Sequence, residues 1–182
     1  SHSALLLDRQ TGQVLSRKNG DQSIYPASLT KLMTVYLAVK ELDPQQVITL
    51  DEPIFPPLYA QQASLAGFEP GERVSALDLM YGALLPSGAE CCVGLAQAMA
   101  GSETAFAEQM NREAKNLGMK HTHFVNSTGL QDLNHYSTAE DLALLLDTAL
   151  EEPLFYQIFT THSYTATGSF HPFGLTFTGT LW

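Results

Sequence analysis

Apolar and polar residues alternate at both ends of the chain, whereas the middle repeats its apolar residues at the spacing of helices. Near the N-terminus two apolar runs, residues 4–7 and 14–15, flank the turn-forming sequence DRQTG and predict a β-hairpin. Near the C-terminus the sequences SYTATGSF and LTFTGTLW alternate like strands. Strands at the ends and helices between them indicate a mixed α/β (α+β) domain with a mainly antiparallel sheet.

Helical spacing is clearest after Ser28, where Leu29, Leu32, Met33, Tyr36, Leu37 and Val39 recur along one segment. Further helices are predicted at residues 75–85, 89–99, 102–117 and 137–152. Their starts are expected at Ser75, at Ser102 and at Ser137 or Thr138, residue types that cap helices. The proline-rich region 47–73 shows no sustained period and is expected to be loop with short strands.

Composition limits the possible classes. The 182 residues are 45% hydrophobic and 15% charged, which suits one domain, residues 1–182, with a sizeable core. Its strands are expected at about 3–24 and 160–182, and its helical region at about 27–155. A net charge of −10 argues against nucleic acid and anionic membrane surfaces as partners. No apolar run reaches the roughly 18 residues that span a bilayer.

Ser28 and Lys31 lie three residues apart at the start of the predicted helix after Pro26. Residues at this spacing share one helix face, so the Lys31 amine can reach the Ser28 hydroxyl. Burial among apolar neighbours favours the uncharged amine, which can accept the serine proton. A helix N-terminus also offers N–H groups to a developing oxyanion. The pattern therefore suggests a serine nucleophile with a lysine base, although a capping serine beside a solvent-exposed lysine would have the same sequence.

The surrounding sequence separates these alternatives. The segment YPASLTKLMTVYLAVKEL resembles the active-site segment of the serine D-alanyl-D-alanine carboxypeptidases, the low-molecular-mass penicillin-binding proteins of peptidase S11 type. The likeness extends in the right order over residues 4–28, 70–130 and 136–165. It implies a penicillin-binding-protein/β-lactamase-like fold, in which a helical subdomain packs on an antiparallel sheet that is incomplete in this chain.

The second motif of that family is Ser-x-Asn, and here it reads Ser87-Gly88-Ala89, followed by Glu90. By resemblance, Ser87 passes a proton between the lysine and the leaving amine. The asparagine amide is lost at Ala89, so either Glu90 or an ordered water takes its place, or activity is weaker. A charged Glu90 close to Lys31 would hold the lysine in its charged form, which is unsuited to a base.

The third motif, Lys-Thr-Gly on a strand beside the site, has two possible alignments. In one, the sequence FTGT at residues 177–180 is a degenerate copy, with Phe177 in place of the lysine and with Thr178 and Gly179 lining the site. In the other, which fits the spacing better, residues 180–182 precede the motif and the chain ends before it. The cation for the substrate carboxylate would then lie outside this chain.

The remaining candidates are weaker. Adjacent Cys91 and Cys92 sit in an apolar helical run and are expected to be buried thiols. His121 and His123 would share a strand face, but no third ligand is evident, so no metal is expected. Leu130, in the sequence LQDLN, stands where the deacylating glutamate of class A β-lactamases would be, which argues against efficient antibiotic hydrolysis.

The resemblance implies a serine DD-peptidase that removes the terminal D-alanine from peptidoglycan stem peptides and is acylated by β-lactams at Ser28. No cofactor is required. The implied compartment is the bacterial cell envelope outside the cytoplasmic membrane, with any leader or membrane anchor outside this chain. Two alternatives remain open: a β-lactamase or esterase on the same fold, and a non-catalytic fragment or scaffold that lacks the third motif.

Overall fold

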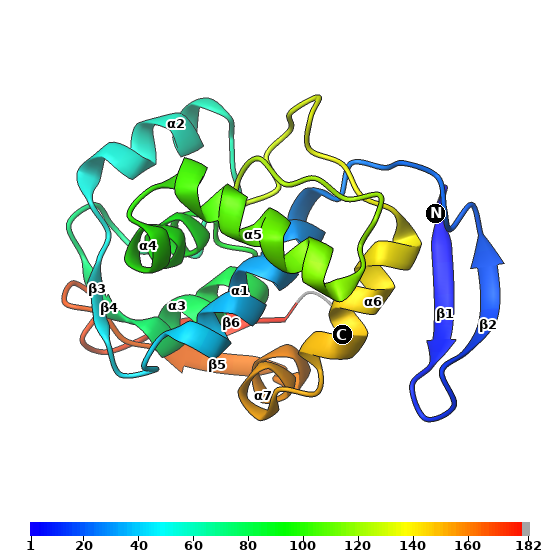
Figure 1. The fold of residues 1–182 in the computed structure, drawn as a ribbon. Helices are drawn as coiled ribbons and strands as arrows, with labels where there is room; N and C mark the ends of the chain where they lie inside the picture. The colour runs from blue at the N-terminus through cyan, green and yellow to red at the C-terminus, as the bar shows by residue number, and fades with distance from the viewer. Residues whose placement is uncertain (180–182) are drawn as a thin grey trace.

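The computed structural model describes residues 1–179, and Figure 1 shows helices gathered around one central helix, with hairpins at the periphery. The helices are α1 (Thr30–Glu41), α2 (Phe55–Ala60), α3 (Ala76–Leu84), α4 (Ala89–Ala100), α5 (Glu103–Leu117), α6 (Ala139–Ala149) and α7 (Pro153–Thr160). The strands are β1 (Ala4–Asp8), β2 (Gln13–Lys18), β3 (Val47–Thr49), β4 (Arg73–Ser75), β5 (Ser163–Ala166) and β6 (Leu175–Thr178). Short 3-10 turns span Ala27–Leu29 and Glu52–Ile54.

The strands form antiparallel pairs, as expected, but they do not form one sheet within the described part of the chain. β1 pairs with β2, β3 with β4, and β5 with β6, which gives three two-stranded sheets. In Figure 1 the β1–β2 hairpin stands at the right edge, and the β5–β6 hairpin lies below α1 and α3. The mixed helix-and-strand class is therefore confirmed, whereas the single sheet joining both ends is not seen in residues 1–179.

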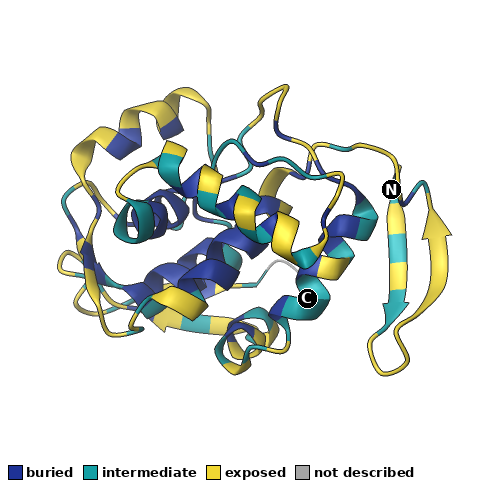
Figure 2. Cartoon of the chain, viewed as in Figure 1, coloured by how far each residue is buried: buried dark blue, intermediate teal, exposed yellow. Residues whose placement is uncertain are grey.

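The core lies between α1, α3 and α4, which appear dark blue at the centre of Figure 2. Every residue of α1 from Thr30 to Ala38 is buried, so this helix is surrounded by neighbours rather than lying on the surface. α3 and α4 are almost as enclosed, and both pack on α1. A helix that is buried on all sides carries apolar residues on most of its faces, which is why the residues after Ser28 are so rich in apolar side chains.

The predicted caps are present. The side chains of Ser75, Ser102 and Thr138 accept backbone N–H bonds at the starts of α3, α5 and α6, and each satisfies a donor that the helix leaves unpaired. Of the two alternatives for α6, Thr138 is the cap. Gly118 ends α5 with a φ of +82°, in the left-handed region that glycine reaches without strain.

Two helices were missed. α2 lies in the region expected to be loop, and α7 begins where the helical region was expected to end. Both helices carry proline in their first turn. Proline has no backbone N–H, but at this position an N–H would have no acceptor within the helix, so its absence removes no hydrogen bond. Each buries a short apolar stripe, Phe55 and Leu58 in α2 and Phe155 and Ile158 in α7. The prolines therefore mark helix starts here, although the sequence alone suggested loop.

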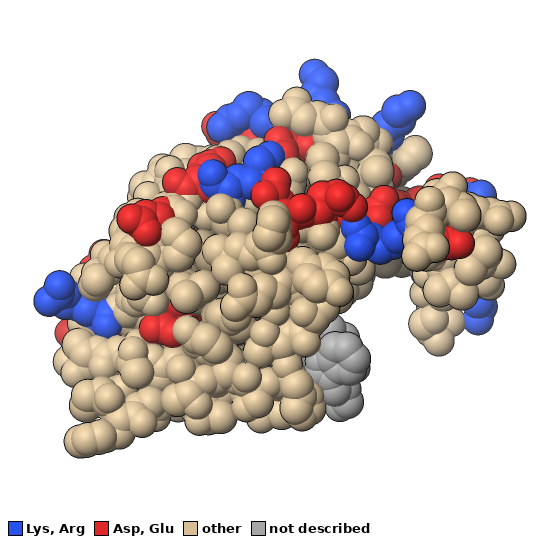
Figure 3. Space-filling view, turned by 90° about the horizontal axis from the view of Figure 1, so that it is seen from below, with Lys and Arg blue, Asp and Glu red and all other residues tan. Residues whose placement is uncertain are grey.

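Charged side chains are distributed unevenly. Residues 153–182 contain no Asp, Glu, Lys or Arg. The face seen from below in Figure 3 is almost all tan over its lower part, whereas charged side chains lie over its upper part, at its left edge and on the hairpin. Within residues 1–179 no helix is both long and apolar enough to cross a bilayer.

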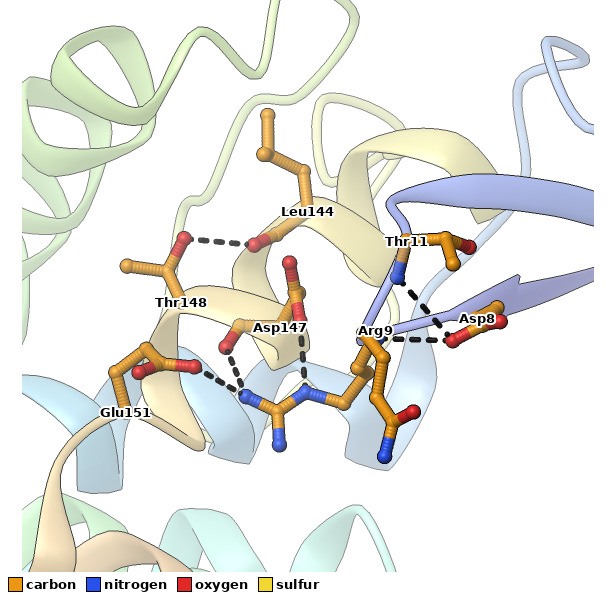
Figure 4. Close-up of polar contacts among 8 residues, drawn as sticks. Asp8, Arg9, Thr11, Leu144, Asp147, Thr148 and Glu151 are labelled. Atoms are coloured by element: carbon orange, nitrogen blue, oxygen red, sulfur yellow. Dashed lines mark hydrogen bonds and ion pairs between the residues drawn. The ribbon is translucent and has the colours of Figure 1, made fainter.

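Arg9 ties the β1–β2 hairpin to α6 (Figure 4). Its Nε donates to Asp147 Oδ1 at 2.7 Å, and its Nη2 donates to Glu151 Oε1 at 2.6 Å. In the same turn the Asp8 carboxylate accepts the N–H of Gln10 at 2.8 Å, which lowers the pKa of Asp8. Because most of the hairpin is exposed, these ion pairs rather than apolar burial orient its turn against the helix.

Replacing Arg9 with alanine is expected to loosen the hairpin without unfolding the protein. Exposed ion pairs contribute about 0.2–1 kcal/mol each, so the free energy of unfolding should fall by about 1 kcal/mol and the loss should shrink in high salt. Amide hydrogen exchange at residues 9–13 should rise in the variant, while the exposed-arginine control Arg112→Ala on α5 leaves it unchanged. Equal exchange in both variants would show that the Arg9 pairs do not hold the turn.

Candidate active site

Ser28 lies in the 3-10 turn Ala27–Leu29, immediately before α1, and not on the α-helix itself. Ala27 has a φ of +49°, a conformation that non-glycine residues rarely adopt. Gly129 lies against this turn so closely that a Cβ there would sit 1.8 Å from the Ala27 carbonyl oxygen. The turn that presents Ser28 is therefore supported by the loop around Gly129.

Lys31 occupies the first turn of α1 and is only 4% exposed. Its Nζ lies 3.2 Å from Ser28 Oγ and 2.8 Å from Ser87 Oγ. Ser87 Oγ in turn donates to Ser28 Oγ at 3.0 Å, so the three polar atoms form a closed triangle. Among residues 1–179 no carboxylate pairs with Lys31, and an amine without a fixed anion beside it is suited to accept a proton.

Ser87 reaches this triangle from the turn between α3 and α4. Its φ is +66°, which strains the backbone of a non-glycine residue. The next residue, Gly88, donates its N–H to the Gly82 carbonyl at 2.8 Å. A Cβ at Gly88 would come within 2.7 Å of Ala66 Cβ, so glycine is required there. The structure thus brings Ser28, Lys31 and Ser87 together, as the motif predicted.

Ala89 and Glu90 lie at the start of α4 and do not bind Lys31. Ala89 is buried and donates its N–H to the Ser64 carbonyl at 2.8 Å. Glu90 Oε1 accepts the N–H groups of Ala66 at 2.7 Å and Gly67 at 2.9 Å. Burial raises the pKa of Glu90. The suggestion that Glu90 replaces the missing asparagine beside the lysine therefore finds no hydrogen bond in the described structure.

Of the two residues expected to line the site, Gly179 does so and Thr178 does not. Thr178 is exposed at the end of β6. Gly179, whose N–H donates to the His162 carbonyl at 2.8 Å, lines a hollow of about 440 Å³ beside Ser28 and Ser87. The other walls of this hollow are mainly apolar and include Leu29, Leu32, Leu85, Leu146 and Phe159.

The degenerate alignment of the third motif supplies no cation. Phe177 stands where the motif has its lysine. It is buried, and its ring packs edge-on against the ring of Phe68, with 5.8 Å between the ring centroids. The competing alignment uses residues 180–182, which lie outside the described residues. Neither alignment therefore gives a positive charge for a substrate carboxylate within residues 1–179.

The cysteines and histidines singled out in the sequence make ordinary structural contacts. Cys91 and Cys92 are free and buried, and burial raises the pKa of Cys92 to about 12. His123 Nδ1 contacts the Asn134 carbonyl at 2.6 Å, and the His121 backbone N–H donates to Asp141. In the described part of the chain no cluster of three or more His, Cys, Asp or Glu side chains could hold a metal.

Sequence reasoning missed His135, a buried side chain that binds Thr30, the residue after the turn that carries Ser28. Its Nδ1 accepts the Val125 N–H at 3.1 Å, which leaves the proton on Nε2, and Nε2 donates to Thr30 Oγ1 at 2.7 Å. Thr30 lies between Ser28 and Lys31 in sequence. Burial lowers the pKa of His135 to about 4. A histidine in a loop carried no local signal for this contact, because its partner Thr30 is on α1, 105 residues away in the sequence.

The comparisons with known proteins agree with this geometry. The family model for D-alanyl-D-alanine carboxypeptidase, peptidase S11, matches residues 1–181. The chain belongs to this family. It is 38% identical over 153 residues to D-alanyl-D-alanine carboxypeptidase DacF of Bacillus subtilis, covering 82% of this chain and 39% of the relative. It is 37% identical over 177 residues to carboxypeptidase DacD of Escherichia coli, covering 90% of this chain and 44% of the relative.

Solved structures show the same fold. The Streptomyces K15 DD-transpeptidase superimposes with a TM-score of 0.89 at 27% identity, covering 98% of this chain and 73% of the other. Penicillin binding protein 6B of Escherichia coli gives a TM-score of 0.83 at 37% identity, covering 90% and 54%. The expected family and fold are thus confirmed. The chain spans 39% and 44% of the length of the two carboxypeptidases above.

Protonation of His135 is expected to destabilise the fold in mild acid. In the folded protein the Val125 N–H donates to Nδ1 of His135, so this nitrogen cannot also carry a proton and the ring is neutral. In the unfolded chain the His135 side chain takes up a proton near pH 6.5, its ordinary pKa. The unfolded state therefore binds more protons between pH 6.5 and about 4, and the free energy of unfolding falls by up to about 3 kcal/mol as pH drops through this window. The nearby charges on Asp132 and His123 act in opposite directions on this pKa.

Chemical denaturation between pH 4 and 7 tests this expectation. His135→Gln should flatten the pH dependence over the window, while the exposed-histidine control His121→Asn retains the slope. A variant at His135 with the same slope as the unsubstituted protein would exclude His135 as its source.

Proposed function

We propose that the full-length protein is a serine DD-peptidase that removes the terminal D-alanine from peptidoglycan stem peptides through an acyl-enzyme at Ser28. One observation carries the proposal: Ser28 Oγ, Lys31 Nζ and Ser87 Oγ lie within 2.8–3.2 Å of one another at the edge of a hollow. A hydroxyl, an amine and a second hydroxyl in this arrangement form a nucleophile, its base and a proton carrier. Membership of the carboxypeptidase family supplies the substrate class.

Acylation uses each group once. Ser28 Oγ attacks the carbonyl carbon of the penultimate D-alanine while its proton passes to the uncharged Lys31 amine. The carbonyl oxygen becomes negative, and we expect the backbone N–H of Ser28 to help stabilise it, because the N–H groups of Leu29 and Thr30 already donate to the carbonyls of Pro26 and Ala27. The C–N bond then breaks, and the proton travels from Lys31 through Ser87 to the leaving amine of D-alanine. An ester between Ser28 and the shortened peptide remains.

Deacylation reverses the proton path. Water attacks the ester carbonyl and gives one proton to Lys31, the bond to Ser28 Oγ breaks, and the proton returns to the serine. The products are the shortened peptide acid and the restored hydroxyl. Phe177 cannot provide the cation for the substrate carboxylate, and by resemblance to the family a Lys-Thr-Gly motif would supply it.

The same attack explains why β-lactams are proposed as covalent ligands, since their ring amide presents a reactive carbonyl to Ser28. One similar structure is that of a penicillin binding protein, penicillin binding protein 6B of Escherichia coli. We also propose the bacterial cell envelope, outside the cytoplasmic membrane, as the compartment, because the substrate class is found there. The two named carboxypeptidases are bacterial, as is that penicillin binding protein.

A fluorescent penicillin and a D-Ala-D-Ala peptide test this function in the full-length protein. Ser28→Ala should abolish covalent labelling and D-alanine release, because no other group in the triangle replaces the nucleophile. Lys31→Ala and Ser87→Ala should each lower the acylation rate by about 10²–10⁴-fold, the usual contribution of a positioned acid or base.

Ser16→Ala, on the exposed face of the hairpin, is the matched serine control and should label normally. Folding of each variant is checked by circular dichroism. Labelling that survives in folded Ser28→Ala, or its absence from the folded unsubstituted protein, would overturn the proposal.

A further inference from the structure

Glu90, three residues after Ser87 in the sequence, is a fully buried carboxyl to which the mechanism above gives no role. Its exposure is 0%, and its two carboxyl oxygens are used unequally. Oε1 accepts the N–H groups of both Ala66 and Gly67, while Oε2 is buried without a hydrogen-bond partner in the described structure. Burying a carboxyl with one unpaired oxygen costs free energy of folding. The two hydrogen bonds made by Oε1 offset part of this cost, and they also fix the backbone of Ala66 and Gly67.

The segment that Glu90 binds, residues 64–68, packs directly on the turn that carries Ser87. The Ser64 carbonyl accepts the Ala89 N–H at 2.8 Å. Ala66 lies so near Gly88 that a Cβ on Gly88 would be 2.7 Å from Ala66 Cβ and 3.0 Å from its nitrogen. Segment 64–68 therefore touches the two residues that follow Ser87, and it leaves the turn no room to relax on that side.

Ser87 needs such support because its backbone is strained. A φ of +66° is unfavourable for a residue with a Cβ and persists only where the surroundings impose it. Where the family motif has an asparagine, Ala89 offers no polar side chain to brace the turn. The backbone bonds of Gly88 and Ala89 and the contacts of segment 64–68 remain.

Segment 64–68 also contacts β6. The Phe68 ring packs edge-on against Phe177 of β6, and Leu175 of β6 lies 3.4 Å from the Cβ position of Gly67. β6 leads to Gly179, which lines the hollow beside Ser28. One buried carboxyl thus binds a segment that contacts both the Ser87–Gly88 turn and β6.

We propose that Glu90 is a positioning residue for Ser87: its two hydrogen bonds hold segment 64–68 against the Ser87–Gly88 turn and keep Ser87 Oγ within reach of Lys31 and Ser28. Glu90 touches no reacting atom and acts through the segment. As far as catalysis is concerned, this inference rests on the proposed function.

Three variants of the full-length protein test the inference. Glu90→Ala removes the acceptor for both N–H groups, whereas Glu90→Gln keeps a carbonyl oxygen that can accept them. Glu72→Ala is the matched control. Glu72 is also 0% exposed, and its carboxylate accepts the N–H of Glu69 at 2.9 Å and contacts His171 Nδ1 at 2.9 Å. It therefore binds the residue after segment 64–68 and the loop at His171, and not the N–H groups of Ala66 and Gly67.

The rate of acylation by a fluorescent penicillin is measured per folded molecule, together with KM and kcat for D-alanine release. Glu90→Ala should slow acylation by about 30-fold or more and lower kcat with KM nearly unchanged, because proton relay through Ser87 is impaired. Glu90→Gln should restore acylation to within about threefold of the unsubstituted protein. Glu72→Ala should lose stability but acylate at the normal rate.

Hydrogen exchange gives a readout that does not need activity. Glu90→Ala should raise exchange at the amides of Ala66, Gly67 and Gly88, and Glu72→Ala should not. If the unsubstituted protein is not acylated, the proposed function fails, and the exchange data alone decide whether Glu90 holds the segment. Normal acylation in Glu90→Ala, equal losses in Glu90→Ala and Glu72→Ala, or unchanged exchange at Gly88 would overturn the inference.

Discussion

The buried amine of Lys31 is the constraint on which the rest of the site depends. An amine in the interior loses its water, so it must find hydrogen-bond partners within the protein. It finds Ser28 and Ser87, and each is presented by a turn that contains a residue at positive φ, Ala27 in one case and Ser87 itself in the other. The turns that carry Ser28 and Ser87 are therefore both strained, and both contact the N-terminal end of α1 at Lys31. Their strain is offset by close packing, from the Gly129 loop on one side and from segment 64–68 on the other.

Local features of the fold could be predicted because their causes are local. A side-chain cap acts within three residues, and a hairpin turn within five, so the caps at Ser75 and Ser102 and the β1–β2 hairpin follow from short sequence windows. Ser28 and Lys31 belong to the same class, since one helical turn separates them. Ser87 lies 59 residues from Ser28, and only the family motif connected it to the site.

Features that depend on distant partners could not be predicted in this way. His135 becomes meaningful only when Thr30 lies beside it, 105 residues away in sequence. Glu90 was read as a neighbour of Lys31 because both belong to the motifs, yet its hydrogen bonds go to segment 64–68, which has no motif at all. The α2 and α7 helices were missed because proline signals a helix start as well as a break, and only tertiary burial of Phe55 or Phe155 decides between them.

The placement of charge around Lys31 follows the same logic. With a net charge of −10 the chain has many carboxylates, and one of them, Glu90, follows the second motif directly. An ionised carboxylate beside the amine would stabilise its charged form and weaken it as a base. Burial raises the pKa of Glu90, which favours the uncharged acid, and its Oε1 is engaged by two backbone N–H groups. In the described structure this carboxyl binds the backbone of segment 64–68 and makes no hydrogen bond to the lysine.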